Sequence, residues 1–315
     1  MASGRTIAMA DRYAGTLLGL ACGDALGGPV EFRSREDIAA GFPGGVHEFM
    51  GGGWLSLEPG EVTDDTQQTL ILADALTETG LDLDRFAGGL IAWYQGGPKD
   101  IGDTTRIALE ALAAGTSPLE TGEIALAARG VRGAASNGAV MRCAPVALRF
   151  RRDPARLVAA SLDSARITHA EERAAWATVA VNQAIVHLLE GGEIGDAPEA
   201  AIKGVPNDEV CAAIREAADR ERGDIRARGF VLETIGASFW SLVHGKDARD
   251  AIELAVAFGD DADSTGAVTG ALAGAAYGVD ALPVTWRDAV QFREQLTATA
   301  ARLSVLAERD EAGAV

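Results

Sequence analysis

The densest group of chemically capable side chains lies in the segment FGDDADSTGAVTGALAGAAYG, residues 258–278. Asp260, Asp261 and Asp263 occupy one turn, and two hydroxyl residues follow, the first of them Ser264. Carboxylates this close repel one another unless a cation lies among them, and oxygen-rich clusters are the ligands that Mg²⁺ and Mn²⁺ prefer. Aspartate and serine also cap helices, but a cap needs only one such residue. The turn therefore favours a metal site over simple capping.

A second acidic turn of the same design, EVTDDT, lies far earlier in the chain. Thr63 is placed to cap the apolar helical pattern that follows, and Asp64 and Asp65 fall in the first helical turn. Acidic residues in a first turn are common because their charge interacts favourably with the helix dipole, so one such motif is weak evidence for a metal site. Two oxygen-rich helix starts that faced each other would supply ligands from both sides of a two-metal centre.

Isolated carboxylates in glycine-rich segments provide further candidates. Glu31 follows a Gly-Gly-Pro break, and Asp100 follows Gly-Gly-Pro-Lys. Asp103 precedes two threonines and is predicted to cap a helix. Asp100 is not placed to cap a helix and is therefore the better candidate to contact a substrate. Asp24 falls near the end of a predicted helix, where the dipole disfavours an anion, so it needs a hydrogen-bonding partner.

Small polar residues begin another predicted helix at Ser136, Asn137 and Gly138. Free backbone amides at such a helix start can bind an anion, although a plain cap fits the same residues. His169 also lies at a predicted helix start, where a ligand could reach it. His187 falls inside an apolar helical pattern and is expected to be structural.

Helical periodicity runs through nearly the whole chain, so we expect an all-α fold. Glycine recurs every fourth residue in two segments, beginning at Gly15 and at Gly266, which lets another backbone approach one face of each helix. Residues 191–207 are expected to form a surface loop, and the chain is expected to be one domain, 1–315. The expected helices are 10–25, 64–79, 83–96, 103–114, 137–150, 154–167, 171–190, 207–220, 228–244, 247–257, 264–278 and 287–307.

The composition excludes several classes of protein. A chain of 315 residues with 48% hydrophobic residues can bury a large core and is not mainly disordered. A net charge of −18 leaves no basic surface for nucleic acid or anionic membranes. Three dispersed cysteines give no disulfide framework. The apolar windows are too short for a membrane span, and a reducing cytoplasm is the expected compartment.

Taken together and in order, six motifs resemble the ADP-ribosylglycohydrolase family. They are GDALGGPVE, PGEVTDDTQQTL, GPKDIGDTT, SNGAVMRCAP, THAEERA and FGDDADSTGAVTGALAGAAYG, which cover most of the chain. The resemblance implies a compact, orthogonal, all-α bundle around a central two-metal site holding Mg²⁺ or Mn²⁺. It also implies a hydrolase that removes ADP-ribose from arginine of a protein or a small guanidine compound.

The same resemblance implies roles for individual residues. Glu31 matches a glutamate near the metals, and Asp100 matches the aspartate that arginine-specific members use near the scissile bond. Asp260 stands where relatives often carry glycine, and no role is implied for it. The implied metal ligands are Thr63, Asp64, Asp65, Asp261, Asp263 and Ser264, and the implied ADP-ribose contacts are Ser136, Asn137, Gly138 and His169.

Three alternatives stay open at this point. The enzyme could act on serine-linked or other O-linked ADP-ribose. The chain could be a non-catalytic ADP-ribose-binding relative, although all six implied ligand positions keep an oxygen-bearing side chain. The acidic turns could be caps alone, in which case Mg²⁺ or Mn²⁺ would not stabilise the protein.

Overall fold

The computed structural model describes residues 7–312, and this part of the chain forms sixteen α-helices and no β-sheet. The prediction of an all-α fold is therefore confirmed. The helices are α1 (Met9–Gly27), α2 (Arg35–Gly41), α3 (Asp64–Ala75), α4 (Leu83–Gln95), α5 (Asp103–Ala113), α6 (Pro118–Ala134), α7 (Ala144–Phe150), α8 (Pro154–Arg166), α9 (Glu172–Leu189), α10 (Ala197–Ala201), α11 (Asp208–Arg215), α12 (Val231–His244), α13 (Ala248–Val256), α14 (Ala262–Tyr277), α15 (Val284–Ala289) and α16 (Arg293–Ala312).

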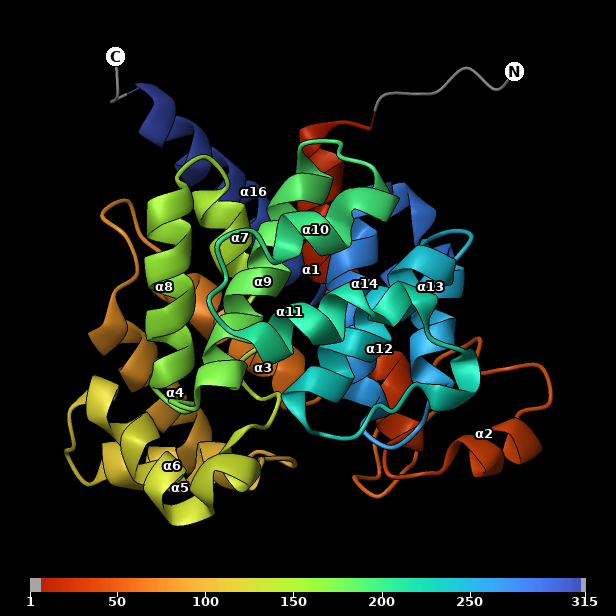
Figure 1. Cartoon of the computed structure of the whole chain (residues 1–315), viewed down its shortest axis with the longest axis horizontal. Coiled ribbons are helices and arrows are strands. Elements are labelled where there is room, and N and C mark those ends of the chain that lie inside the picture. The colour runs from red at the N-terminus through yellow and green to blue at the C-terminus, as the bar shows by residue number, and fades with distance from the viewer. Residues whose placement is uncertain (1–6, 313–315) are drawn as a thin grey trace.

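Helices α1 and α14 lie against each other at the centre of the molecule (Figure 1). Their contact is made by the two glycine ladders. A Cβ added at Gly19 would lie 2.2 Å from the carbonyl oxygen of Gly270, and one added at Gly23 would lie 2.0 Å from that of Gly266. Any larger side chain would collide with backbone. The sequence predicted a close approach for each ladder, and the structure adds that the ladders are each other's partners.

The two central helices run antiparallel, which determines where the acidic turns meet. At the end of α1, a Cβ added at Gly27 would lie 2.3 Å from the carbonyl oxygen of Ala262, at the start of α14. The segment that follows α1 therefore reaches the aspartate turn. The start of α3 joins them, because the amide of Thr63 donates a hydrogen bond to Asp24 in α1.

The remaining helices pack around this pair. One contiguous buried cluster includes side chains from Tyr13 in α1 to Leu306 in α16. Among residues 7–312, no helix is both long enough and apolar enough to cross a membrane.

The helix predicted at 137–150 is wrong in its first half. Residues 137–143 form turns, and α7 begins only at Ala144. Pro145 lacks the amide that would donate to the carbonyl of Met141, so the helix cannot run through this point. The amide of Asn137 bonds instead to the carbonyl of Gly229, at 3.2 Å. Ser136, Asn137 and Gly138 are consequently not a helix start.

Other boundaries also differ from the prediction. The expected surface loop 191–207 contains the short helix α10, which buries Ala197 and Ala201. The helix expected at 287–307 is split into α15 and α16 by Phe292, whose backbone is left-handed with φ 61°. Helices α2 and α6 were not predicted; Gly130, with φ 67°, kinks α6 and interrupts its pattern.

Replacement of Gly270 by alanine should destabilise the protein. The new Cβ would lie 2.0 Å from the carbonyl oxygen of Gly19, which forces the central helices apart. Overpacking of this kind costs about 1–3 kcal/mol or more. Urea unfolding should therefore shift to lower denaturant concentration.

The matched control is Gly88→Ala, in the exposed face of α4, where an added Cβ meets no atom within 4 Å. Alanine there should be neutral or stabilise by about 0.5–1 kcal/mol. Equal stability of the Gly270→Ala and Gly88→Ala proteins would contradict the assigned helix contact.

Candidate active site

A cleft of about 570 Å³ opens where the end of α1 meets the starts of α3, α5 and α14. Two of the predicted site residues, Thr63 and Asp65, lie buried beneath its floor. All the others line it. At one side, which we call the acid end, lie Glu31, Asp64, Asp100, Asp261 and Asp263, with Ser264 beside them; at the other, the polar end, lie Ser136, Asn137, Gly138 and His169.

Carboxylates from four separate segments meet at the acid end. Oxygen atoms of Glu31, Asp100 and Asp263 all lie within 4.8 Å of one another. Beneath them, the Thr63 hydroxyl lies 3.2 Å from Asp65 Oδ2 and 3.5 Å from Asp263 Oδ2. The acidic turns that open α3 and α14 thus face each other, as the sequence predicted.

Asp24 fixes the start of α3 below the cleft. Its buried carboxylate accepts hydrogen bonds from the amide and hydroxyl of Thr63, at 2.9 and 2.8 Å, and from those of Thr66, at 3.1 and 2.6 Å. These four donors are the partners that Asp24 needed near the end of α1. Thr63 occupies the N-cap position of α3, but its side chain makes no capping hydrogen bond, so that part of the prediction is wrong.

The acid end is electrostatically costly without a cation. Burial, reinforced by neighbouring carboxylates, raises the pKa of Asp64, Asp65 and Asp263 well above the usual range. Burial raises the pKa of Glu31 to about 8, although the hydrogen bond from Trp54 lowers this pKa in part. Burial and the charge of Asp261 together raise the pKa of Asp100 to about 6.

The donor set fits a hard divalent cation. Asp65 is 1% exposed, and its Oδ1 atom has no hydrogen-bond partner among the described residues. An unpartnered buried carboxylate oxygen is expensive, and the neighbouring carboxylates and hydroxyls are the ligands of Mg²⁺ or Mn²⁺. The residues at the acid end are therefore suited to hold metal ions.

A directed chain of hydrogen bonds orders the polar end. The Arg142 guanidinium donates to the Thr168 hydroxyl at 2.6 Å, and this hydroxyl lies 2.8 Å from His169 Nδ1. Since arginine can only donate, the threonine proton points to Nδ1, and His169 Nε2–H donates to the Ser136 hydroxyl at 2.9 Å. Burial and the nearby charge of Arg142 lower the pKa of His169 to about 3, so the ring is neutral.

Arg142 also joins the two ends of the cleft, a role that the sequence did not predict. Its Nη1 donates to the carbonyl of Gly138 at 2.7 Å and to Gln68 Oε1 at 2.6 Å. Gln68 in turn donates to Asp64 Oδ2 at 2.9 Å. The available signal was an arginine within the apolar motif SNGAVMRCAP, because a charge buried at such a position needs several acceptors.

Two aspartates that lie close in sequence to site residues, Asp103 and Asp260, are not part of the carboxylate cluster at the acid end. Asp103 was predicted to cap α5, but the N-cap residue is Gly102, and the Asp103 carboxylate pairs with Arg106 and Arg129 at 3.2 and 3.0 Å. Asp260 does not line the cleft; its left-handed backbone, φ 53°, donates to the carbonyl of Arg33 at 2.8 Å.

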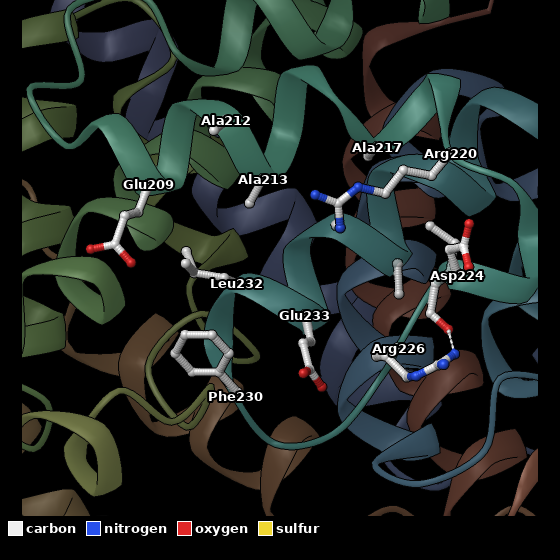
Figure 2. A pocket seen from close by; sticks show the side chains of 13 residues that line it. Glu209, Ala212, Ala213, Ala217, Arg220, Asp224, Arg226, Phe230, Leu232 and Glu233 are labelled. Atoms are coloured by element: carbon white, nitrogen blue, oxygen red, sulfur yellow. Dashed lines mark hydrogen bonds between the residues drawn. The ribbon is translucent and has the colours of Figure 1, made fainter.

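A second hollow, of about 320 Å³, lies between α11 and α12 (Figure 2). Its lining mixes acidic and basic side chains, such as Glu209 and Glu233 with Arg220 and Arg226. Mixed charges of this kind need no metal ion to balance them. We therefore place the candidate active site in the first cleft.

Comparison with known proteins identifies relatives along nearly the whole chain. The family model described as ADP-ribosylglycohydrolase matches residues 5–313. The ADP-ribosylarginine hydrolase Tri1 of Serratia proteamaculans (strain 568) is 32% identical over 310 residues, which cover 96% of this chain and 81% of that protein. An ADP-ribosyl-dinitrogen reductase glycohydrolase of Rhodospirillum rubrum is 34% identical over 289 residues, covering 88% and 89% of the two chains.

A solved structure gives the same result. A chain of an ADP-ribosylglycohydrolase-related protein complex superimposes with a TM-score of 0.82 at 32% identity, covering 95% of this chain and 99% of that one.

The metal-free protein should lose stability as the pH rises. The folded-state pKa of Glu31 is raised from 4.5 to about 8, so above pH 4.5 the unfolded chain ionises this group while the folded chain keeps its proton. The penalty grows until about pH 8, and one pKa unit corresponds to about 1.4 kcal/mol. In the presence of a chelator, thermal unfolding should show a shallower fall between pH 5 and 8 for Glu31→Gln than for the wild type.

Added Mg²⁺ or Mn²⁺ should raise the unfolding temperature more at pH 8 than at pH 5, because ligand carboxylates must lose their protons to bind.

For the metal-free protein, identical pH profiles of the unfolding temperature in the wild type and Glu31→Gln would show that burial does not raise the pKa of Glu31.

Proposed function

Because the chain belongs to the ADP-ribosylglycohydrolase family of glycosidic-bond hydrolases, we propose that it removes ADP-ribose from arginine, cleaving the N-glycosidic bond in a protein or small guanidine compound. The convergence of Glu31, Asp100 and Asp263 in a cleft with a neutral polar end is the observation that carries this proposal. We further propose that residues 1–315 form one such domain. The buried cluster that extends from Tyr13 to Leu306 supports it.

The facing acidic turns are the proposed site for two divalent cations, Mg²⁺ or Mn²⁺. When bound there, the cations would orient the ribose hydroxyls and activate the attacking water. The proposed ligands are Thr63, Asp64, Asp65, Asp261, Asp263 and Ser264.

The polar end is the proposed site for the ADP-ribose moiety. Ser136 and His169 are held in place by the hydrogen-bond chain from Arg142, and Asn137 donates to Asp261 at 3.1 Å. The Asn137 contact connects the two ends, so a sugar bound at the polar end reaches the carboxylates. A neutral His169 suits a neutral ribose or an anionic phosphate as a hydrogen-bonding group, without carrying a charge of its own.

Two carboxyl groups are placed for proton transfer. Guanidine leaves readily only as a protonated group, so the reaction needs a general acid. The pKa of Asp100, raised to about 6 by burial and the charge of Asp261, suits a group that recognises or protonates the guanidine nitrogen near neutral pH. Glu31, held by Trp54 Nε1 at 2.6 Å, is the proposed partner in these proton transfers.

Asp64→Ala and Asp263→Ala should each abolish ADP-ribose release. Each substitution removes a proposed ligand, and the loss should exceed the roughly 100-fold effect of removing an outer partner of a metal ligand. Chromatography should detect ADP-ribose released from arginine-linked peptide by the wild type with Mg²⁺ or Mn²⁺. Serine-linked peptide should release much less.

The matched control is Asp260→Asn, which changes the neighbouring aspartate outside the cleft and keeps a residue that tolerates a left-handed backbone. It should retain wild-type activity. Full activity of an Asp64→Ala/Asp263→Ala protein in a chelator would end the metal proposal, and preferential release from serine would end the arginine proposal.

A further inference from the structure

Two large aromatic side chains stand exposed at the rim of the cleft. Phe32 is 67% exposed and Trp54 is 52% exposed, and both line the cleft. Their ring centroids lie 5.3 Å apart, so they form one continuous surface, which we call the aromatic wall. Exposed apolar surface of this kind beside a functional site commonly marks a place where a ligand binds.

The backbone holds Phe32 in a strained position. Its φ is 62°, in the left-handed region that a bulky residue rarely adopts. The amide of Phe32 donates to the carbonyl of Asp260 at 2.6 Å, and the amide of Asp260 donates to the carbonyl of Arg33 at 2.8 Å. These paired bonds attach Phe32 to the aspartate turn, and such strain is concentrated at ligand-binding sites.

Trp54 lies on the loop that precedes α3, and its position is also fixed by contacts. A Cβ added at the preceding Gly53 would lie 2.9 Å from the Cα atom of Pro29, so the loop packs directly on the chain that follows α1. The indole nitrogen of Trp54 donates to Glu31 Oε2 at 2.6 Å. The aromatic wall is therefore built against the acid end.

The groups around the aromatic wall favour the binding of a cation. Glu31 and Asp100, whose carboxylate oxygens lie within 4.8 Å of each other, line the same cleft as the rings, and Glu31 accepts the hydrogen bond from Trp54. A planar guanidinium is the group that aromatic faces and carboxylates bind together. The basic side chains in the cleft lining, Arg129 and Arg132, lie instead on α6, next to Gly133 and the polar end, where they suit the diphosphate.

We propose that Phe32 and Trp54 hold the arginine side chain from which ADP-ribose is released, and so determine specificity for this linkage. This inference rests on the proposed function. The ADP-ribose moiety occupies the polar end, the bond to be cut lies over the acid end, and the guanidinium and its alkyl chain lie against the aromatic wall. Trp54 is in addition a positioning residue for Glu31, through its indole N–H.

The test separates substrate affinity from product affinity. Trp54→Leu removes the aromatic face and the donor, and Phe32→Asn removes the ring while suiting the left-handed backbone. Each should raise KM for arginine-linked ADP-ribose about tenfold, as expected for the loss of a cation–π contact. The Kd for free ADP-ribose, measured by calorimetry, should stay within about twofold, because this ligand has no guanidinium.

Two further variants separate the effect of losing the aromatic face from that of losing the indole N–H, and from the effect of replacing any exposed phenylalanine. Trp54→Phe keeps an aromatic face but loses the N–H, so KM should return to within about threefold of wild type while kcat falls. Phe292→Asn is the matched control, because Phe292 is also a partly exposed phenylalanine with φ 61° but does not line the cleft. It should change neither KM nor Kd.

An unchanged KM in Trp54→Leu and Phe32→Asn would overturn the inference, and so would an equal loss of ADP-ribose affinity, which would place the adenosine half against the rings. Failure of the proposed function looks different. In that case the wild-type protein binds ADP-ribose but releases none from arginine.

Discussion

The backbone contact between α1 and α14 is the constraint on which the rest of the structure depends. Where glycines of the two helices face each other, the carbonyl groups of one helix lie where a Cβ of the other would be. Because the helices run antiparallel, Gly27 at the end of α1 meets Ala262 at the start of α14. This single contact delivers Asp24 and Glu31 to the aspartate turn, although these segments are separated by most of the chain.

The cost of this arrangement is electrostatic. Asp64 and Asp263 lie in the first turns of α3 and α14, where the helix dipoles favour anions. Asp24 lies near the end of α1, where the dipole is unfavourable, and four donors from Thr63 and Thr66 offset this. The remaining repulsion raises the pKa values at the acid end, and a divalent cation would relieve it. The same crowding of carboxylates makes a guanidinium a fitting substrate group, and the aromatic wall completes its surroundings.

Local sequence patterns predicted much of this site. Acidic residues before apolar helical segments identified the starts of α3 and α14, and the glycine ladders identified close helix contacts. The patterns failed where long-range contacts decide the structure. Pro145 already prevents a helix over residues 137–143, and the bond from Asn137 to the distant Gly229 decides where residues 136–138 lie instead. Asp103 pairs with Arg129 instead of capping α5. The connections through Arg142 and the strained position of Phe32 depend on partners distant in sequence, so no local pattern contains them.

Diffraction from a crystal grown with Mn²⁺ and ADP-ribose would show whether the facing acidic turns hold two metal ions beside the bound sugar. We expect two anomalous peaks between the starts of α3 and α14, roughly 3.5–4 Å apart. The oxygen atoms around them should belong to Thr63, Asp64, Asp65, Asp261, Asp263 and Ser264, with ADP-ribose extending to the polar end. ADP-ribose bound in the cleft with no anomalous peak beside it would contradict the account.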